Sequence, residues 1–198
     1  MKRLVVATTN QGKLREIQAI LAPLNWEVIS TKAYQEFPEI EERGTTFEAN
    51  AIEKARATAA FTGETALADD SGLEVDYLGG APGVYSARFA GEPKDDDANN
   101  AKLLRLLEGV PQEKRAARFR CVIAVAFPEG RVLTADGRCE GYILTELRGA
   151  GGFGYDPLFY VPEFGKTFAE LPLEVKNRIS HRAAALAKIK ETLANLVE

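Results

Sequence analysis

One run of apolar residues limits the possible fold more than any other feature of this 198-residue chain. Residues 121–127 read Cys-Val-Ile-Ala-Val-Ala-Phe, and such an uninterrupted run is typical of a central strand buried on both faces. The tripeptide Pro128-Glu129-Gly130 follows, and residues 131–142 have a second strand pattern. Because a connection this short predicts an antiparallel hairpin, we expect a mixed sheet rather than a purely parallel one.

The N-terminal segment predicts a strand, a polar loop and a helix. Residues 4–7 are apolar, residues 8–13 are small and polar, and apolar residues recur at helical spacing from Leu14 to Leu21. The free amides and the dipole of a helix N-terminus attract anions, so this arrangement favours a phosphate site. The spacing of a Walker A loop is absent, and a polar turn with a helix cap is the alternative.

Composition excludes several classes of function. Apolar residues make up 45% and charged residues 27% of the chain, as in ordinary globular proteins, and the net charge is -4. There is no Lys or Arg run for a nucleic-acid backbone, no apolar run long enough for a membrane span, and no signal-peptide pattern. Cys121 and Cys139 lack metal-ligand spacing, so we interpret them as small core residues in a reducing cytosol. The length fits one domain, or one core in two lobes.

Two adjacent carboxylates stand out in the stretch Ala68-Asp69-Asp70-Ser71-Gly72. The preceding apolar residues predict a short buried strand, and the glycines that follow predict that the chain turns out of the core here. Since neighbouring side chains of an extended chain point to opposite faces, Asp69 and Asp70 are expected to have different roles. Asp-Ser-Gly is also ordinary turn chemistry, so a simple turn is the alternative.

Acidic residues occur at two further places. Residues 36–43 form an irregular acidic segment, which is usually just solvated. It precedes a helix capped by Thr45 or Thr46, on which Asn50 and Lys54 share a face. Residues 95–97, all Asp, stand where another helix begins, and this position favours a cap that complements the helix dipole over a metal site.

A second glycine-rich segment, residues 149–157, contains aromatic side chains and a carboxylate. This combination suits a flat heteroaromatic ring better than a phosphate, with a tight turn as the alternative. Ser180 is the expected N-cap of the last helix, whose apolar residues extend to Val197. That cap places His181, the only histidine, in the first turn with Arg182, shortly after Lys176. A lone histidine is more often a bystander than a functional group.

Seven stretches form a series along the chain: residues 8–13 (TTNQGK), 46–51 (TFEANA), 68–73 (ADDSGL), 79–83 (GGAPG), 86–88 (SAR), 152–157 (GFGYDP) and 180–182 (SHR). Taken in this order, they resemble the motif series of the inosine/xanthosine triphosphate pyrophosphatases, also called dITP/XTP pyrophosphatases or HAM1-like proteins. The resemblance covers nearly the whole chain, and Thr9 and Gln11 fall where the family itself varies.

The resemblance implies an α/β fold with two lobes, a mixed and curved central sheet flanked by helices, and a cleft between the lobes. It implies a single pyrophosphatase domain over residues 1–198 and a cytoplasmic homodimer. The implied activity is Mg²⁺-dependent hydrolysis of ITP, dITP and XTP to the monophosphate and pyrophosphate. This activity cleanses the nucleotide pool and keeps these nucleotides out of DNA and RNA. The implied partner is the small nucleotide, with neither nucleic acid nor membrane.

The resemblance also assigns roles to individual residues. Asp70 resembles the catalytic base and a metal ligand, and Glu41 resembles the second metal ligand. Because the acidic segment aligns least well, Glu39 or Glu42 could replace Glu41. The residues that resemble substrate contacts are Thr8, Thr9, Asn10, Gln11, Gly12, Lys13 and Ser71 at the triphosphate, and Phe153, Gly154, Tyr155, Asp156, Lys176, His181 and Arg182 at the base and sugar.

Three other functions are alternatives to this one. A module that binds nucleotides without cleaving them would keep the glycine loops and Lys13 but would not need Asp70. A phosphatase that forms an aspartyl-phosphate would need a D-x-D spacing after a strand, which is absent. A related pyrophosphatase of the septum-inhibitor type, acting on modified pyrimidines, is the closest alternative.

Overall fold

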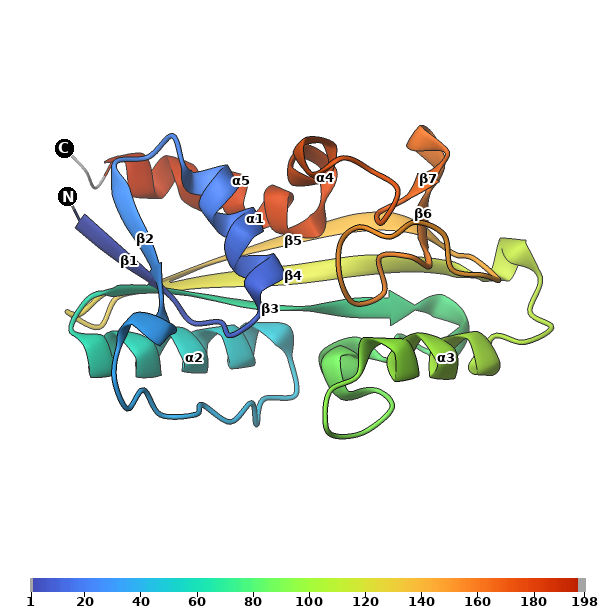
Figure 1. Cartoon of the computed structure of the whole chain (residues 1–198). Helices are drawn as coiled ribbons and strands as arrows, with labels where there is room; N and C mark the ends of the chain where they lie inside the picture. Colours follow the sequence, from blue (N-terminus) through green and yellow to red (C-terminus); the bar gives the residue numbers. More distant parts are fainter. Residues whose placement is uncertain (1, 196–198) are drawn as a thin grey trace. The chain divides into compact units, whose positions relative to one another are not determined.

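The computed structural model describes residues 2–195 and contains a mixed sheet flanked by helices (Figure 1). Within these residues the sheet has seven strands in the order β2-β1-β3-β4-β5-β6-β7. The strands are β1 Lys2–Val6, β2 Trp26–Ser30, β3 Thr65–Val75, β4 Ala116–Ala126, β5 Val132–Ile143, β6 Phe159–Val161 and β7 Lys166–Thr167. The α-helices are α1 Gln11–Leu21, α2 Phe47–Thr62, α3 Asp96–Leu106, α4 Leu173–Ile179 and α5 His181–Asn195. Val197 lies outside the described residues.

The expected mixture of strand directions is confirmed. Strand β1 pairs in parallel with β2 and β3, whereas β6 pairs antiparallel with both β5 and β7. Strands β4 and β5 are neighbours, and the turn between them is closed by a hydrogen bond from the amide of Phe127 to the carbonyl of Arg131 at 2.9 Å. The apolar run therefore forms the first strand of a hairpin, as its sequence predicts.

The chain divides into two compact units, each with its own core. Unit 1 comprises Met1–Asp70, Cys121–Gly137 and His181–Glu198, and unit 2 comprises Ser71–Arg120 and Arg138–Ser180. A single functional domain over residues 1–198 stays a prediction. None of the helices in the described part of the chain is long and apolar enough to cross a membrane.

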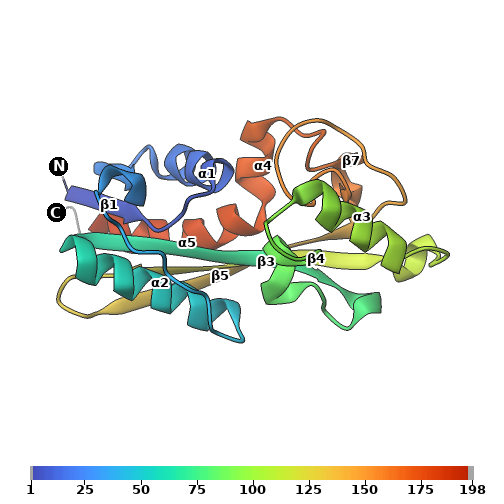
Figure 2. The ribbon, with the colours of Figure 1, turned by 60° about the horizontal axis from the view of Figure 1, so that its bottom comes forward.

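In unit 1, helices α1 and α5 lie against each other on one face of the strands and α2 lies on the other face (Figures 1 and 2). Apolar residues of β1, β3 and β4 pack against the inner faces of α1 and α5. Gly137 of β5 permits a close approach to α5, because an added Cβ there would overlap the main chain of His181 and Ala185. The buried core residues include Leu4, Val6, Ile17, Leu21, Leu67, Ile123, Val125, Leu186 and Ile189.

In unit 2, aromatic rings and a buried arginine hold the elements together. The rings of Phe119, Phe159 and Phe168 form a cluster with centroids 4.6–5.6 Å apart. Arg115 is 2% exposed and donates to main-chain carbonyls, with Nη1 2.7 Å from the oxygen of Leu107 and Nε 2.7 Å from that of Ile143. These bonds fix the end of α3 to the end of β5 and satisfy carbonyls that the helix leaves unpaired.

One local prediction is wrong. Strand β3 does not end at Ala68, before the two carboxylates, but continues in extended conformation to Val75. The continuation is explained by burial, because Leu73 and Val75 lie on one face of the strand and are both fully buried. The two carboxylates therefore stand on a strand within the sheet rather than on a loop.

Candidate active site

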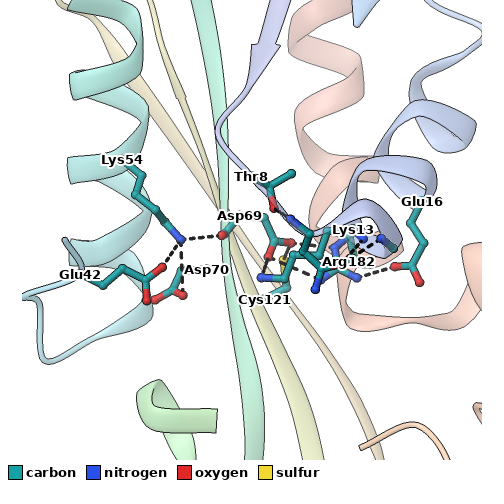
Figure 3. A network of polar contacts seen from close by, with 11 residues as sticks. Thr8, Lys13, Glu16, Glu42, Lys54, Asp69, Asp70, Cys121 and Arg182 are labelled. Atoms are coloured by element: carbon teal, nitrogen blue, oxygen red, sulfur yellow. Dashed lines mark hydrogen bonds and ion pairs between the residues drawn. The ribbon is translucent and has the colours of Figure 1, made fainter. Parts of the chain in front are cut away.

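Adjacent residues of β3 carry the two carboxylates to opposite sides of the sheet (Figure 3). The carboxylate of Asp69 is fully buried and accepts hydrogen bonds from three elements. Lys13 Nζ lies 2.5 Å from Oδ1, Arg182 Nε lies 2.7 Å from Oδ2, and Cys121 Sγ lies 3.1 Å from Oδ2. The prediction that Asp69 and Asp70 face opposite directions is confirmed.

A buried charge network surrounds Asp69. Arg182, whose side chain is 1% exposed, donates through Nε to Asp69 and through Nη1 to the carboxylate of Glu16 on α1. Burial opposes ionisation of Asp69, but the charges of Arg182 and Lys13 outweigh it and hold the pKa of this carboxyl well below its usual range. Asp69, Glu16, Arg182 and Lys13 are two acids and two bases, so the formal charges of these four side chains cancel, and their bonds link α1, β3 and α5.

The segment before α1 is organised by side-chain caps. Asn10 is the N-cap, and its Oδ1 accepts from the amides of Gly12 at 2.9 Å and Lys13 at 3.1 Å. Oγ1 of Thr8 accepts from the amide of Asn10 at 3.1 Å. The predicted helix N-terminus is confirmed, although α1 already begins at Gln11. Lys13 keeps 17% of its side chain exposed while its ammonium bonds Asp69.

Asp70, on the other side of β3, is buried and incompletely paired. It is 5% exposed, Oδ1 lies 3.7 Å from Lys54 Nζ, and Oδ2 has no hydrogen-bond partner within residues 2–195. Burial raises the pKa of Asp70 to about 6, the charge of Glu42 adds to the rise, and Lys54, Lys13 and a hydrogen bond with Asn50 oppose it. A carboxyl with these properties is suited to accept a proton near neutral pH.

The acidic segment supplies a second carboxylate through Glu42. Lys54 Nζ lies 2.6 Å from Oε1 of Glu42 and 3.7 Å from Oδ1 of Asp70, so one ammonium bridges the two acids (Figure 3). The carboxylate of Glu41 instead pairs with Arg43 at 2.6 Å, and its side chain is 69% exposed. Of the alternatives that the sequence leaves open, the contacts of the structure favour Glu42 beside Asp70.

The carboxylates of Asp70 and Glu42 fit a hard divalent cation. Oδ2 of Asp70 is a buried acceptor without a partner in the described part of the chain, and a cation would satisfy it. The described residues contain no cluster of three or more potential metal-ligating side chains. Mg²⁺ is commonly held by one or two carboxylates, with water and substrate phosphates as its other ligands, so two acids are enough.

The residues predicted to contact the base lie mainly in a loop of unit 2. Asp156 Oδ2 accepts from the amide of Phe153 at 3.0 Å and from Lys176 Nζ at 2.6 Å. Lys176 Nζ also lies 4.6 Å from the centroid of the Phe153 ring. Tyr155 is buried and donates its hydroxyl to the carbonyl of Ser86 at 2.6 Å. Phe153 is thus the partly exposed aromatic residue of this loop.

The remaining predicted residues fall in both units. Ser180 lies directly before α5, and His181 and Arg182 occupy the first turn of this helix, as the sequence predicts. His181 is 4% exposed. Unit 1 contains residues 8–13, Glu41, Asp70, His181 and Arg182, whereas unit 2 contains Ser71, residues 153–156 and Lys176.

Sequence reasoning missed Glu16 and Cys121 as neighbours of Asp69. Glu16 lies well away from the apolar side of α1 defined by Leu14 and Ile17, so its spacing marks it as exposed, yet it is 2% exposed. Cys121 gave no signal beyond its place in an apolar run. Lys54 did give one, because it shares a helix face with Asn50, and both prove to lie close to Asp70.

Comparison with known proteins decides the family. The model of the Ham1 family matches residues 4–192. The chain belongs to the Ham1 family. Two relatives are named dITP/XTP pyrophosphatase. The protein from Desulforamulus reducens is 66% identical to this chain, and the protein from Geobacter sulfurreducens is 59% identical. The matches cover 98% of this chain in both cases, and 96% and 97% of the relatives.

Solved structures of Ham1 proteins agree with the fold of this Ham1 chain. The Ham1 protein of Coxiella burnetii superposes with a TM-score of 0.89 at 44% identity, covering 98% of this chain and all of the other. The Ham1 protein of Staphylococcus aureus gives a TM-score of 0.87 at 42% identity with the same coverage. The predicted family and the mixed α/β class are therefore confirmed.

Proposed function

We propose that this protein hydrolyses ITP, dITP and XTP to the nucleoside monophosphate and pyrophosphate and so removes non-standard purines from the nucleotide pool. The observation that carries the proposal is Asp70, a buried carboxylate with an unpartnered oxygen and a pKa raised to about 6 by burial. The relatives that are 66% and 59% identical are named dITP/XTP pyrophosphatase, which supports the same substrates here.

At the phosphates, Asp70 is proposed to orient the attacking water and accept its proton. The segment from Thr8 to Lys13 places a helix N-terminus and the Lys13 ammonium where they can bind an anion. Positive charge on Lys13 stabilises the pyrophosphate as it leaves, and this stabilisation grows as charge develops in the transition state. The bond from Lys13 to Asp69 fixes the ammonium before the substrate arrives.

Asp70 and Glu42 are proposed to hold the metal ion, for which we propose Mg²⁺. When bound, the cation neutralises charge on the triphosphate and lowers the pKa of water. The proposal keeps Asp70 as the metal ligand predicted from the sequence and replaces Glu41 by Glu42. It rests on the ammonium of Lys54, which lies 2.6 Å from Glu42 and 3.7 Å from Asp70.

At the base, the loop around Phe153 is proposed to contact the purine ring. Its main-chain amides and His181 are the proposed donors to the C6 carbonyl of hypoxanthine and xanthine. The guanidinium of Arg182 is occupied by Asp69 and Glu16, so we propose that Arg182 acts by positioning the first turn of α5. Adenine presents an amino group to the donors, and sites that read a polar group can discriminate by up to ~10⁴-fold.

The cellular setting and the assembly remain proposals based on family resemblance. We propose a cytoplasmic homodimer. The mass of one chain is 21.6 kDa, and sedimentation at micromolar concentration should give a single species of twice that mass. A monomer alone would contradict the dimer without touching the proposed chemistry.

The activity is tested with a substrate panel and product identification. The protein is incubated with Mg²⁺ and each of ITP, dITP, XTP, GTP, ATP and a modified pyrimidine triphosphate, and the products are separated by ion exchange. We expect monophosphate and pyrophosphate from the first three substrates and much slower reaction with the others. The Asp70→Asn protein is the matched control for contaminating hydrolases. Equal cleavage of ATP or GTP, binding without cleavage, or preference for the pyrimidine would overturn the proposal.

A further inference from the structure

Helix α3 makes two hydrogen bonds to a single residue of the loop that the proposed function assigns to the base. Gly154 donates its amide to Oδ2 of Asp96 at 2.9 Å, and its carbonyl accepts from Nδ2 of Asn100 at 2.9 Å. Asp96 and Asn100 are four residues apart, so they lie on the same face of α3. Both polar groups of one peptide residue are therefore held by one helix.

Gly154 needs such support because of its conformation. Its φ is +60°, in the left-handed region that only glycine adopts readily, and no atom lies near the position of a Cβ to restrain it. A glycine without side-chain packing has several accessible conformations. The bonds to α3 select one of them for the residue that follows Phe153 in the chain.

The contact from Asn100 has an energetic cost. Asn100 is 3% exposed, and its Oδ1 is buried without a hydrogen-bond partner in residues 2–195. An unsatisfied buried acceptor is unfavourable, and this cost offsets part of what the bond to Gly154 contributes to stability. The bond that holds the Gly154 carbonyl is the contribution of Asn100 that the structure shows.

Helix α3 is itself firmly held in unit 2. Asn99 accepts from the amide of Ala90 at 2.7 Å and donates to the carbonyl of Ala87 at 2.9 Å, and Arg115 fixes the far end of the helix at the carbonyl of Leu107. The short helix Gly83–Arg88 adds a further support, because its Ser86 carbonyl accepts from the hydroxyl of Tyr155. The loop around Gly154 is thus attached to rigid elements on both sides.

We infer that Asp96, assisted by Asn100, is a positioning residue that pre-organises the Phe153–Asp156 loop for the base of the substrate. This inference rests on the proposed function of the loop. A loop already held in its bound conformation loses less entropy when a ligand binds, so the contact with α3 increases affinity for the base. The phosphates and Asp70 do not depend on it.

The test compares Asp96→Ala with Asp97→Ala. Asp97 stands in the same first turn of α3, is exposed and makes no hydrogen bond to the loop, so its replacement matches the loss of charge at the helix N-terminus. We expect Asp96→Ala to raise KM for ITP and dITP about fivefold to tenfold with kcat within about twofold, because the lost binding is equal in the ground and transition states. Asp97→Ala should leave KM within about twofold of wild type on the same grounds.

Three further measurements separate positioning from general support of the fold. Asp96→Asn keeps an acceptor for the Gly154 amide and should restore most of the affinity. Asn100→Leu removes the donor to the Gly154 carbonyl and should also raise KM, with kcat within about twofold. The two products are also compared as inhibitors of Asp96→Ala and of wild type. IMP retains the base and should bind the variant more weakly than wild type, whereas pyrophosphate lacks a base and should bind both proteins equally well.

An unchanged KM in Asp96→Ala, an equal rise in Asp97→Ala, or a fall in kcat at constant KM would overturn the inference. Wild-type protein that leaves ITP intact would instead contradict the proposed function, so the two failures can be told apart.

Discussion

Arg182 donates through Nε to Oδ2 of Asp69 at 2.7 Å, and this bond joins residues 113 positions apart in the sequence. Both side chains are at most 1% exposed. A carboxylate buried in this way is tolerated only because its charge is paired and its oxygens are hydrogen-bonded. The pair therefore fixes the first turn of α5 to β3, on the side of the strand opposite to Asp70.

The first prediction separates the two carboxylates. Asp70→Asn should lower kcat by at least ~10²-fold, as expected for a positioned acid or base, while the protein stays folded. Asp69→Asn should instead destabilise the fold by about 3–5 kcal/mol, because it removes the buried negative charge that Arg182 and Lys13 share. Steady-state kinetics and urea unfolding of both variants check these outcomes. Near-normal turnover by Asp70→Asn would refute the assignment.

The second prediction concerns the metal ligand. Glu42→Gln should raise the Mg²⁺ concentration required for half-maximal activity by about tenfold or more, because one of two proposed anionic ligands is lost. Glu41→Gln is the matched control, since the Glu41 side chain is 69% exposed and pairs with Arg43. Activity is titrated with Mg²⁺ at fixed ITP. A larger effect at Glu41 than at Glu42 would restore the assignment made from the resemblance.

The third prediction concerns Lys13. Lys13→Ala should lower kcat/KM for ITP, XTP and GTP by similar factors, because the Lys13 ammonium is proposed to act on the phosphates that all three nucleotides share. The measurement is kcat/KM for each nucleotide in both proteins. The variant also loses a partly buried ion pair with Asp69, so thermal unfolding is recorded alongside. A change in the ratio of ITP to GTP would show that Lys13 influences the base.

Much of the fold could be predicted from local patterns. The hairpin of β4 and β5 followed from an apolar run and a short turn, and the N-cap at Asn10 followed from a polar residue before a periodic segment. The sequence predicts a shorter strand than β3, because Asp and Gly are residue types with low strand propensity and they occupy positions 69, 70 and 72. Burial of Leu73 and Val75 outweighs that local preference.

The contacts of the candidate site show more clearly what local sequence patterns do not predict. Asp70 and Lys13 were recognised from their motifs, but the partners of Asp69 come from distant segments, and no local pattern predicts their pairing. The choice between Glu41 and Glu42 also depended on tertiary contacts, because the two residues are adjacent and chemically identical. Their ion pairs distinguish them, because Glu42 pairs with Lys54 whereas Glu41 pairs with Arg43.

The fourth prediction concerns the close approach at Gly137. A methyl group there would overlap main-chain atoms of His181 and Ala185, which cannot move without displacing the first turn of α5. Gly137→Ala should destabilise the protein by about 1–3 kcal/mol and reduce activity, since it strains the Arg182–Asp69 pair. Thermal unfolding and kcat/KM of Gly137→Ala measure the two effects. Unchanged stability together with unchanged activity would contradict this account.

The last prediction concerns the pH dependence of stability. Burial raises the pKa of Asp70 from 3.8 to about 6. A carboxyl whose pKa is higher in the folded protein binds its proton more tightly there, so its contribution to stability is complete below pH 3.8 and is lost as the pH rises through about 6. The pH dependence from Asp69 has the opposite sign. The pKa of Asp69 is lower in the folded protein, so its contribution to stability is present above the ordinary pKa of the group and is lost as the pH falls. We therefore expect metal-free Asp70→Asn to gain stability relative to wild type between pH 4 and pH 7, by up to about 3 kcal/mol. Urea unfolding in EDTA across this range measures the difference, and a difference that does not change with pH would mean that Asp70 is ionised at its ordinary pKa.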